Sequence, residues 1–199
     1  MDLLTLVTLR GIHATVVPLS VDHCQDLIKA ATDGKLWNIW YASVPTPTNM
    51  AKEIEHRLNL HKQGLMLPFT VIDNITGQAI GMTTYNKIDA VNKRCDIGWT
   101  WYRKSSQRTA INTECKLMLL THAFETLQCI AVTITANEFN LRSRRAIERL
   151  GAKLDGVFRN FKYQNGIVCD YYQYSIIDNE WPRIKTNLNY KLNCNYSLV

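Results

Sequence analysis

Residues 93–136 read KRCDIGWTWYRKSSQRTAINTECKLMLLTHAFETLQCIAVTITA, and the hydrophobic period changes twice within them. Residues 93–102 alternate as a strand does, whereas residues 109–128 carry apolar side chains at helical spacing. The β-branched run at 129–136 is typical of a buried central strand. The stretch predicts a strand, a helix and a second strand, with a ligand site where the first strand ends and the helix begins. On the first strand, alternation predicts one face made of Cys95, Ile97, Trp99 and Trp101.

The flanking segments extend this unit in both directions. Before it, the pattern predicts a strand at 11–20, helices at 21–34 and 48–64, and strands at 67–73 and 78–88. After it, we expect a basic helix at 137–151 and a hairpin at 152–177, whose Asn165–Gly166 pair is a strong turn signal. No linker interrupts this order. We therefore expect one mixed sheet in a single domain over residues 1–199, in which the Asn/Tyr-rich tail 190–199 could be flexible.

Charge and cysteine content limit the classes of function. The 199 residues carry a net charge of +6 (23 − 17), and the excess is concentrated in residues 140–162. This balance suits nucleic acid, a ribosomal surface or a polyanionic cofactor. The six cysteines form no CxxC pair, which predicts reduced thiols and no metal site. The apolar run near the N-terminus follows an acid and soon meets Arg10, so we expect no export signal, no membrane span and a cytoplasmic location.

Four segments together resemble one enzyme family. They are GWTWY, SQRTAINTECKLMLLTHAFETL, ANEFNLRSRRAIERLGA and EWP, in that order. The order is similar to the GNAT superfamily of acetyl-CoA-dependent N-acetyltransferases, and most similar to its branch of RimJ/RimL type, the ribosomal-protein N-terminal acetyltransferases. The resemblance covers roughly residues 10–188 and is most specific over 93–159. It implies an α/β (α+β) fold, with a mixed, mostly antiparallel central sheet of about seven strands flanked by helices.

The resemblance implies a cofactor loop at the start of the helix. In such enzymes the pyrophosphate of CoA rests on backbone amides of a Q/R-x-x-G-x-G/A loop. The corresponding residues here are Gln107, Arg108, Thr109, Ala110, Ile111 and Asn112. Ala110 and Asn112 stand at the glycine positions. Anion binding needs free N–H groups and a helix dipole of about +0.5 charge, which residues other than proline also supply. The alternative is that the segment only opens a core helix.

The basic helix at 137–151 matches the family's second cofactor segment. The resemblance implies that Asn140 contacts the CoA arm and that Ser143 donates a hydrogen bond to the departing sulfur, since Ile147 stands where many relatives carry a tyrosine acid. Both residues could instead be N-terminal caps of the helix. Arg145, with its neighbours Arg142 and Arg144, could meet the CoA phosphates or form a solvated helix face.

The acceptor amine must lose a proton, and Asp96 is the candidate base. Relatives often carry an acid at this place on the strand, and a carboxylate can take the proton directly or through water. The alternative is an ion pair with the nearby Arg94. Some relatives of RimL type carry a glutamate where this chain has Lys162.

Three aromatic residues precede the second predicted helix. They are Trp37, Trp40 and Tyr41, in a loop that borders the acceptor pocket in this family. Aromatic rings attract cationic amines, so these residues could bind the acceptor. They could equally anchor a long loop to the core.

The leading interpretation is direct transfer of an acetyl group from acetyl-CoA to a primary amine, without a metal or a covalent enzyme intermediate. The acceptor would be the α-amine of a protein, including a ribosomal protein, or a small molecule. A homodimer is expected because dimers are frequent in this branch, and neither a membrane nor direct nucleic-acid contact is expected. One alternative is a catalytically degenerate protein that binds CoA or a peptide. Another is a nucleic-acid or ribosome-binding module, which a steep salt dependence of RNA binding would favour.

Overall fold

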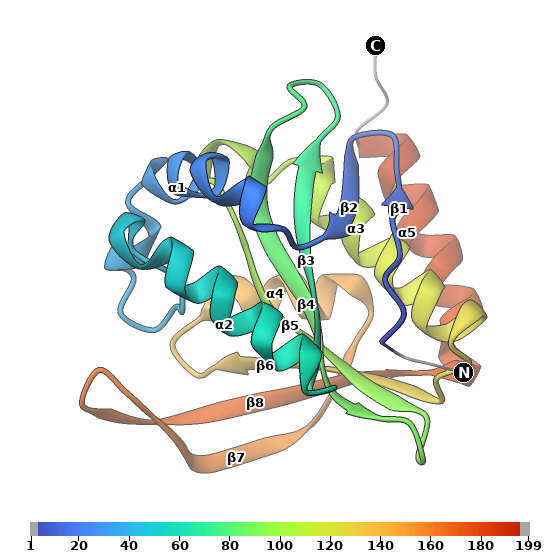
Figure 1. Ribbon diagram of the computed structural model, residues 1–199. Coiled ribbons are helices and arrows are strands. Elements are labelled where there is room, and N and C mark those ends of the chain that lie inside the picture. The colour runs from blue at the N-terminus through green and yellow to red at the C-terminus, as the bar shows by residue number, and fades with distance from the viewer. Residues whose placement is uncertain (1–3, 196–199) are drawn as a thin grey trace.

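The computed structural model describes residues 4–195 and is built around one eight-stranded sheet (Figure 1). The sheet order is β1-β2-β3-β4-β5-β6-β8-β7. Every neighbouring pair is antiparallel except β5 and β6, which are parallel. This confirms the predicted mixed, mostly antiparallel sheet. The strands are β1 (Leu9–Arg10), β2 (Ala14–Pro18), β3 (Met66–Asp73), β4 (Ala79–Asp89), β5 (Arg94–Tyr102), β6 (Ala131–Asn137), β7 (Lys153–Gln164) and β8 (Ile167–Ile177).

Helices cover both faces of the sheet and bury two apolar clusters. One cluster joins the sheet to α1 (Cys24–Thr32) and α2 (Met50–Lys62). The larger cluster joins it to α3 (Ala110–Thr121), α4 (Leu141–Leu150) and α5 (Trp181–Asn195). Figure 1 shows α3 and α5 side by side, on the side of the molecule away from α1 and α2. Burial of these apolar stripes supplies the main driving force for the arrangement.

A bulge interrupts β5 at Trp99. Thr84 of β4 pairs with Gly98, and Met82 pairs with Trp101, so one residue of β4 stands opposite two of β5. Trp99 accommodates the extra residue with a left-handed backbone, φ +53°. The bulge exchanges the faces of the strand, so the predicted face is wrong beyond Gly98. Trp101 packs in the α1/α2 cluster, whereas Tyr102 joins Cys95 in the larger cluster.

The parallel pairing of β5 with β6 is short. It joins Arg94–Asp96 to Ala131–Thr133 and ends there, just before the bulge. The remainder of β6 continues to pair with β8. Since β5 leads into α3 and β6 leads into α4, both helix N-termini lie at the end where the two strands are no longer joined. This end, beyond Asp96 of β5 and Thr133 of β6, is called the β5–β6 opening below.

The C-terminal segment carries a helix into the Asn/Tyr-rich tail. The predicted tail 190–199 is helical as far as Asn195, because α5 continues without interruption. Its apolar side chains Trp181, Ile184 and Leu188 recur at helical spacing and are buried in the larger cluster. Residues 196–199, like residues 1–3 at the other end, lie outside the described residues.

Candidate active site

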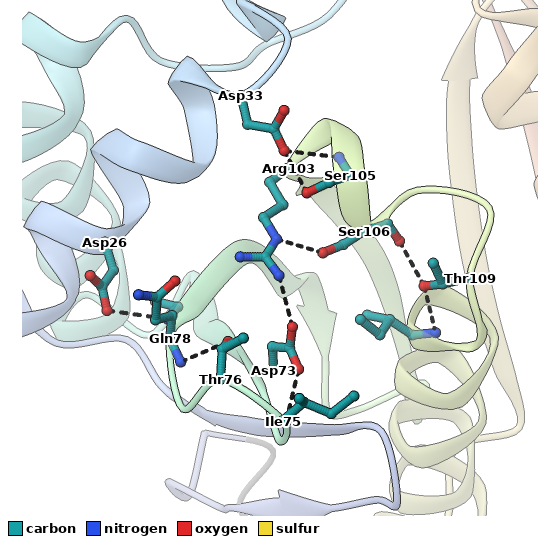
Figure 2. Close-up of polar contacts among 12 residues, drawn as sticks. Asp26, Asp33, Asp73, Ile75, Thr76, Gln78, Arg103, Ser105, Ser106 and Thr109 are labelled. Carbon is teal, nitrogen blue, oxygen red and sulfur yellow. Dashed lines mark hydrogen bonds and ion pairs between the residues drawn. The ribbon is translucent and has the colours of Figure 1, made fainter. Parts of the chain in front are cut away.

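Side-chain contacts hold the loop between β5 and α3 in place (Figure 2). Arg103 donates from Nη2 to Oδ2 of Asp73 (2.8 Å) and from Nε to Oγ of Ser106 (2.8 Å). Asp33, after α1, accepts from the backbone N (2.9 Å) and Oγ (2.6 Å) of Ser105. These hydrogen bonds from Ser105 are the main cause that lowers the pKa of Asp33. The loop is therefore tied to two other segments without any glycine of its own.

The N-terminus of α3 leaves backbone donors available. Thr109 is the N-cap: its hydroxyl donates to the carbonyl O of Ser106 (2.8 Å) and accepts from the N–H of Ile111 (3.4 Å). Arg108 has a left-handed backbone, φ +66°, a conformation that glycine usually supplies. Within residues 4–195, no acceptor engages the N–H groups of Arg108, Thr109 and Ala110. The loop thus presents free amides at the positive end of a helix dipole.

The loop also contacts α4. Gln107 donates from Nε2 to the carbonyl O of Tyr102 (2.9 Å) and accepts at Oε1 from Nη1 of Arg142 (2.5 Å). This contact brings a guanidinium from α4 against the loop before α3, beside the exposed Arg108. The other predicted loop residues are less open: Ile111 is buried in the larger cluster and Asn112 is half-buried. Cationic side chains and free amides therefore share one end of the β5–β6 opening.

The remaining arginines of α4 divide into one that is held and two that are exposed. The guanidinium of Arg144 lies 3.6 Å from the ring centroid of Tyr172 and donates from Nε to Oη of Tyr174 (3.2 Å). Arg145 and Arg149 are exposed to solvent. Arg144 therefore fastens α4 to β8, whereas Arg145 is the exposed arginine nearer the start of α4.

Asn140 and Ser143 have different structural roles at the start of α4. Asn140 is the N-cap, and its Oδ1 accepts from the backbone N of Ser143 (3.0 Å). Ser143 is half-buried, and its hydroxyl forms no hydrogen bond with any group in residues 4–195. The capping alternative thus describes Asn140, whereas the Ser143 hydroxyl is not used for structure.

Asp96 is buried where β5 pairs briefly in parallel with β6, a pairing called the seam below. It stands opposite Asn86 of β4 and Thr133 of β6, and its carboxylate pairs with Nζ of Lys87 at 2.9 Å. The ion pair that the sequence suggested with Arg94 is replaced by this one, because Lys87 reaches Asp96 from the neighbouring strand. Among the described residues, no contact joins Asp96 to Ser143.

The aromatic loop before α2 meets two other segments. The ring of Trp40 lies 5.1 Å from that of Phe139, which precedes the α4 cap, and 5.6 Å from that of Tyr41. The carbonyl O of Trp40 accepts from Nδ2 of Asn165 in the β7–β8 turn (2.8 Å). Trp37 instead packs against the α1/α2 cluster. The fold thus brings Trp40 and Tyr41 near the start of α4 and leaves Trp37 as a loop anchor.

An open pocket of about 480 Å³ lies between this loop, α2 and the β5 bulge. It contains a carboxylate, an imidazole and an indole, on Glu53, His56 and Trp99. Sequence reasoning missed these residues because the first two belong to the polar face of a predicted helix. The exposure of Trp99 could not be foreseen either, since it depends on the bulge. The other residues that line the pocket are Ser43, Val44, Pro45, Thr46, Asn49 and Lys52.

A buried lysine lies beneath the bulge on the α3 side. Lys116 is 5 % exposed and donates from Nζ to Oγ1 of Thr100 (2.8 Å) and Thr83 (3.4 Å). Burial lowers its pKa from 10.5 to about 8, although the neighbouring Cys115 acts in the opposite direction. Its sequence position, inside an apolar helix, gave no sign of this.

We expect Lys116→Met to raise the free energy of unfolding by about 2 kcal/mol at pH 7, because it removes a buried charge and leaves the two threonine hydroxyls bonded to each other at 2.8 Å. Between the folded pKa of about 8 and the unfolded value of 10.5, the unfolded wild type binds more protons, so its stability rises with pH. The advantage of the variant should therefore shrink across this window. Urea unfolding of both proteins from pH 7 to pH 10 measures it, and an advantage that does not change with pH would contradict the assignment.

Two classes of site lack support in the described chain. Across residues 4–195, no three His, Cys, Asp or Glu side chains gather as the ligands of a metal ion would. Over the same range, none of the helices combines the length and the apolar character needed to cross a bilayer.

The comparisons with known proteins agree with this geometry. A family model described as an acetyltransferase (GNAT) domain matches residues 13–153. The chain is 35 % identical over 105 residues to a Bacillus subtilis protein named "Putative ribosomal N-acetyltransferase YdaF", a match that spans 53 % of this chain and little more than half (57 %) of that relative.

Solved structures extend the comparison to most of the chain. A GCN5-related N-acetyltransferase from Brucella melitensis superposes with a TM-score of 0.83 at 25 % identity, over 96 % of this chain and 87 % of that one. RimL, a ribosomal L7/L12 α-N-protein acetyltransferase in complex with coenzyme A, shares the fold with a TM-score of 0.74 at 19 % identity, over 87 % and 99 % of the two chains. The resemblance inferred from the motifs is thereby confirmed, and the chain belongs to the GNAT acetyltransferase family.

Proposed function

We propose that the chain transfers an acetyl group from acetyl-CoA to a primary amine, and that its acceptor is the α-amine of a protein N-terminus. The observation that carries this proposal is the set of free backbone amides at the start of α3, which follows the end of β5 where its pairing with β6 has stopped. The amides and the guanidinium groups of Arg108 and Arg142 suit a pyrophosphate. The related fold of RimL holds coenzyme A, and both RimL and YdaF are named for ribosomal substrates.

Acetyl-CoA supplies a thioester carbonyl carbon, at which the amine nitrogen forms the new C–N bond as the C–S bond breaks. In the proposed mechanism, the hydroxyl of Ser143, which has no hydrogen-bond partner within residues 4–195, donates a hydrogen bond to the departing sulfur. Asn140 orients that part of α4 through its cap. Asp96, held by Lys87, receives the proton that the amine loses, directly or through water.

The acceptor is proposed to enter through the pocket beside α2. The indole of Trp99 and the carboxylate of Glu53 would attract an ammonium group before it loses its proton. Trp40 and Tyr41 would lie beside the peptide residues that follow its N-terminal residue. Trp37 would hold the loop against the α1/α2 cluster. Mass spectrometry of a panel of N-terminal peptides and small amines, each incubated with enzyme and acetyl-CoA, would identify the acceptor class.

Calorimetric titration with acetyl-CoA should give an affinity near the micromolar range, about −8 kcal/mol. In the variant Arg108→Gly we expect affinity to fall about tenfold, because a charge beside the phosphates is lost, while stability is kept or gained, because a left-handed position becomes glycine. Lys93→Gly is the matched control, because this exposed lysine also has a left-handed backbone (φ +51°) but lies in the distant β4–β5 turn. It should change stability by about as much as Arg108→Gly does, and it should leave the affinity for acetyl-CoA unchanged.

Absence of heat and of thermal stabilisation with millimolar acetyl-CoA would refute the proposed function. Tight binding without transfer to any amine would instead favour a degenerate member of the family that binds CoA. Equal affinities of Arg108→Gly and wild type would show that the amides suffice without this charge.

We also propose that the protein is a homodimer. The β7–β8 hairpin exposes large apolar side chains, including Val157, Phe158, Phe161 and Tyr163, along a strand at the edge of the sheet. An uncovered apolar edge of this kind is a common protein interface. Sedimentation equilibrium would determine the oligomeric state, and a monomer at micromolar concentration would contradict the proposal.

A cytoplasmic location is proposed from the cysteines. Those in the described chain (Cys24, Cys95, Cys115, Cys129, Cys169 and Cys194) are all free thiols. Reduced thiols are the usual state in the cytoplasm. Fractionation of the cells that express the protein would test the location.

A further inference from the structure

Two buried cations meet the β5 bulge from opposite faces of the sheet. From α2, Arg57 donates from Nη1 to the carbonyl O of Trp99 (3.4 Å). From α3, Lys116 donates from Nζ to the hydroxyls of Thr100 (2.8 Å) and Thr83 (3.4 Å). Thr83 lies between the two β4 residues whose partners shift in register, so both cations contact the backbone or side chains of the irregularity itself.

The bulged conformation needs support. Trp99 has a left-handed backbone, which is unfavourable for any residue with a Cβ and persists only where the surroundings impose it. Trp99 is also 41 % exposed as a residue, so burial alone does not hold it in place. Arg57 contributes twice, since its guanidinium carbon lies 5.2 Å from the Trp99 ring centroid in addition to the hydrogen bond.

The cations themselves are costly to bury. Arg57 is 0 % exposed, and burial lowers its pKa even though Nε donates to Glu53 at 2.8 Å. Lys116 has hydroxyl partners only, and no carboxylate in residues 4–195 pairs with it. An apolar side chain of similar volume would fill either place at lower cost. Stability therefore does not explain why a lysine occupies position 116, whereas its contacts with the bulge do.

We propose that Arg57 and Lys116 are positioning residues that hold Gly98–Thr100 of β5 in the bulged conformation, and so keep β5 and β6 apart where acetyl-CoA binds. The location of the ligand rests on the proposed function; the effect on the strand does not. The pairing of β5 with β6 ends at Asp96, just before the segment that the two cations contact. A regular β5 would continue to pair with β6 and close the opening.

Amide hydrogen exchange of the ligand-free protein tests the effect on the strand. In Lys116→Met we expect exchange in the peptide covering residues 97–102 to quicken about tenfold, because the hydrogen bonds from Lys116 to this part of the strand are lost. The melting temperature should nevertheless rise, because the free-energy cost of burying the lysine charge is removed. Thr100→Val, which removes the hydroxyl that Lys116 contacts, should quicken the same peptide. Thr100→Ser keeps the hydroxyl and should restore slow exchange. Lys29→Met removes an exposed lysine of α1 and is the matched control.

Unchanged or slower exchange over residues 97–102 in Lys116→Met would overturn the proposal. For Arg57, the double variant Arg57→Met/Glu53→Gln avoids an orphaned carboxylate and should quicken the same peptide.

Titration of the same variants with acetyl-CoA separates the inference from the function. We expect Lys116→Met to bind about tenfold more weakly than wild type, and Thr100→Ser to bind nearly as well as wild type. If wild type binds and Lys116→Met binds equally well, the bulge does not serve the ligand site and that part of the proposal fails. If wild type itself does not bind, the proposed function fails, while hydrogen exchange still decides whether the cations hold the strand.

Discussion

Replacing Glu114 by alanine is expected to lower the free energy of unfolding by about 3 kcal/mol, because its buried carboxylate ties α3 to the turn between β1 and β2. Oε1 accepts from the backbone N of Ile12 (2.7 Å), and Oε2 accepts from those of His13 (2.8 Å) and Ala14 (2.9 Å). Alanine leaves these donors without an acceptor. Water can reach the exposed Ile12 but not the buried Ala14, which limits the compensation. Equilibrium unfolding in urea, followed by circular dichroism, measures the change.

Two further variants define the origin of this loss. Glu114→Gln keeps one acceptor oxygen but turns a donor toward backbone N–H groups, so most of the stability should still be lost. Asp26→Ala removes a carboxylate that pairs with exposed Lys29 (3.2 Å) and accepts one long hydrogen bond from the backbone N of Ala79 (3.4 Å), so it should cost less than about 1 kcal/mol. A loss below about 1 kcal/mol for Glu114→Ala would show that the turn is held by other contacts, such as the hydrogen bonds that Nδ2 of Asn74 donates to the carbonyl O atoms of Gly11 (2.9 Å) and Ile12 (3.0 Å).

Replacing Ser143 by alanine is expected to reduce kcat about a hundredfold, with little change in melting temperature, if its hydroxyl stabilises the departing sulfur. The hydroxyl has no structural partner within residues 4–195, and alanine is a good helix former in the first turn of α4. Steady-state kinetics with saturating acetyl-CoA, together with thermal unfolding, separates the two effects.

The neighbouring cap supplies the control for Ser143. Asn140→Ala removes the acceptor of the Ser143 N–H and should cost about 1 kcal/mol of stability. Asn140→Asp keeps an acceptor oxygen and should preserve stability, so any loss of activity in it reports contact with substrate rather than capping. Full activity of Ser143→Ala would remove the hydroxyl from the mechanism and leave water as the hydrogen-bond donor to the departing sulfur.

The central unit of the fold was predictable because its signals are local. The change from alternation to helical spacing after Tyr102 predicts the β5–α3 boundary, and the Asn165–Gly166 pair predicts the hairpin turn. The helical part of the expected tail was also within reach, since Trp181, Ile184 and Leu188 already stand at helical spacing. These signals depend on side chains close together in the chain, so they survive without tertiary information.

The features that shape the site depend on contacts between distant segments. A bulge adds one residue without changing the composition of a strand, so alternation assigned Trp101 to the wrong face. Lys116 and Arg57 resemble surface charges until the sheet covers them. Asp96 pairs with Lys87 rather than with its near neighbour in sequence because strand register decides which side chains meet.

The short seam between β5 and β6 also has a consequence for how the chain folds. On either side of it, consecutive strands form hairpins with short turns: β3, β4 and β5 on one side, and β7 and β8 on the other. These pairings can form early, because loop closure costs less entropy at short separation. The seam joins Arg94–Asp96 to Ala131–Thr133 across the whole of α3, so it requires a longer closure than any of these hairpins. The gap between β5 and β6 is therefore expected to appear only after both hairpin units have formed and docked through α3.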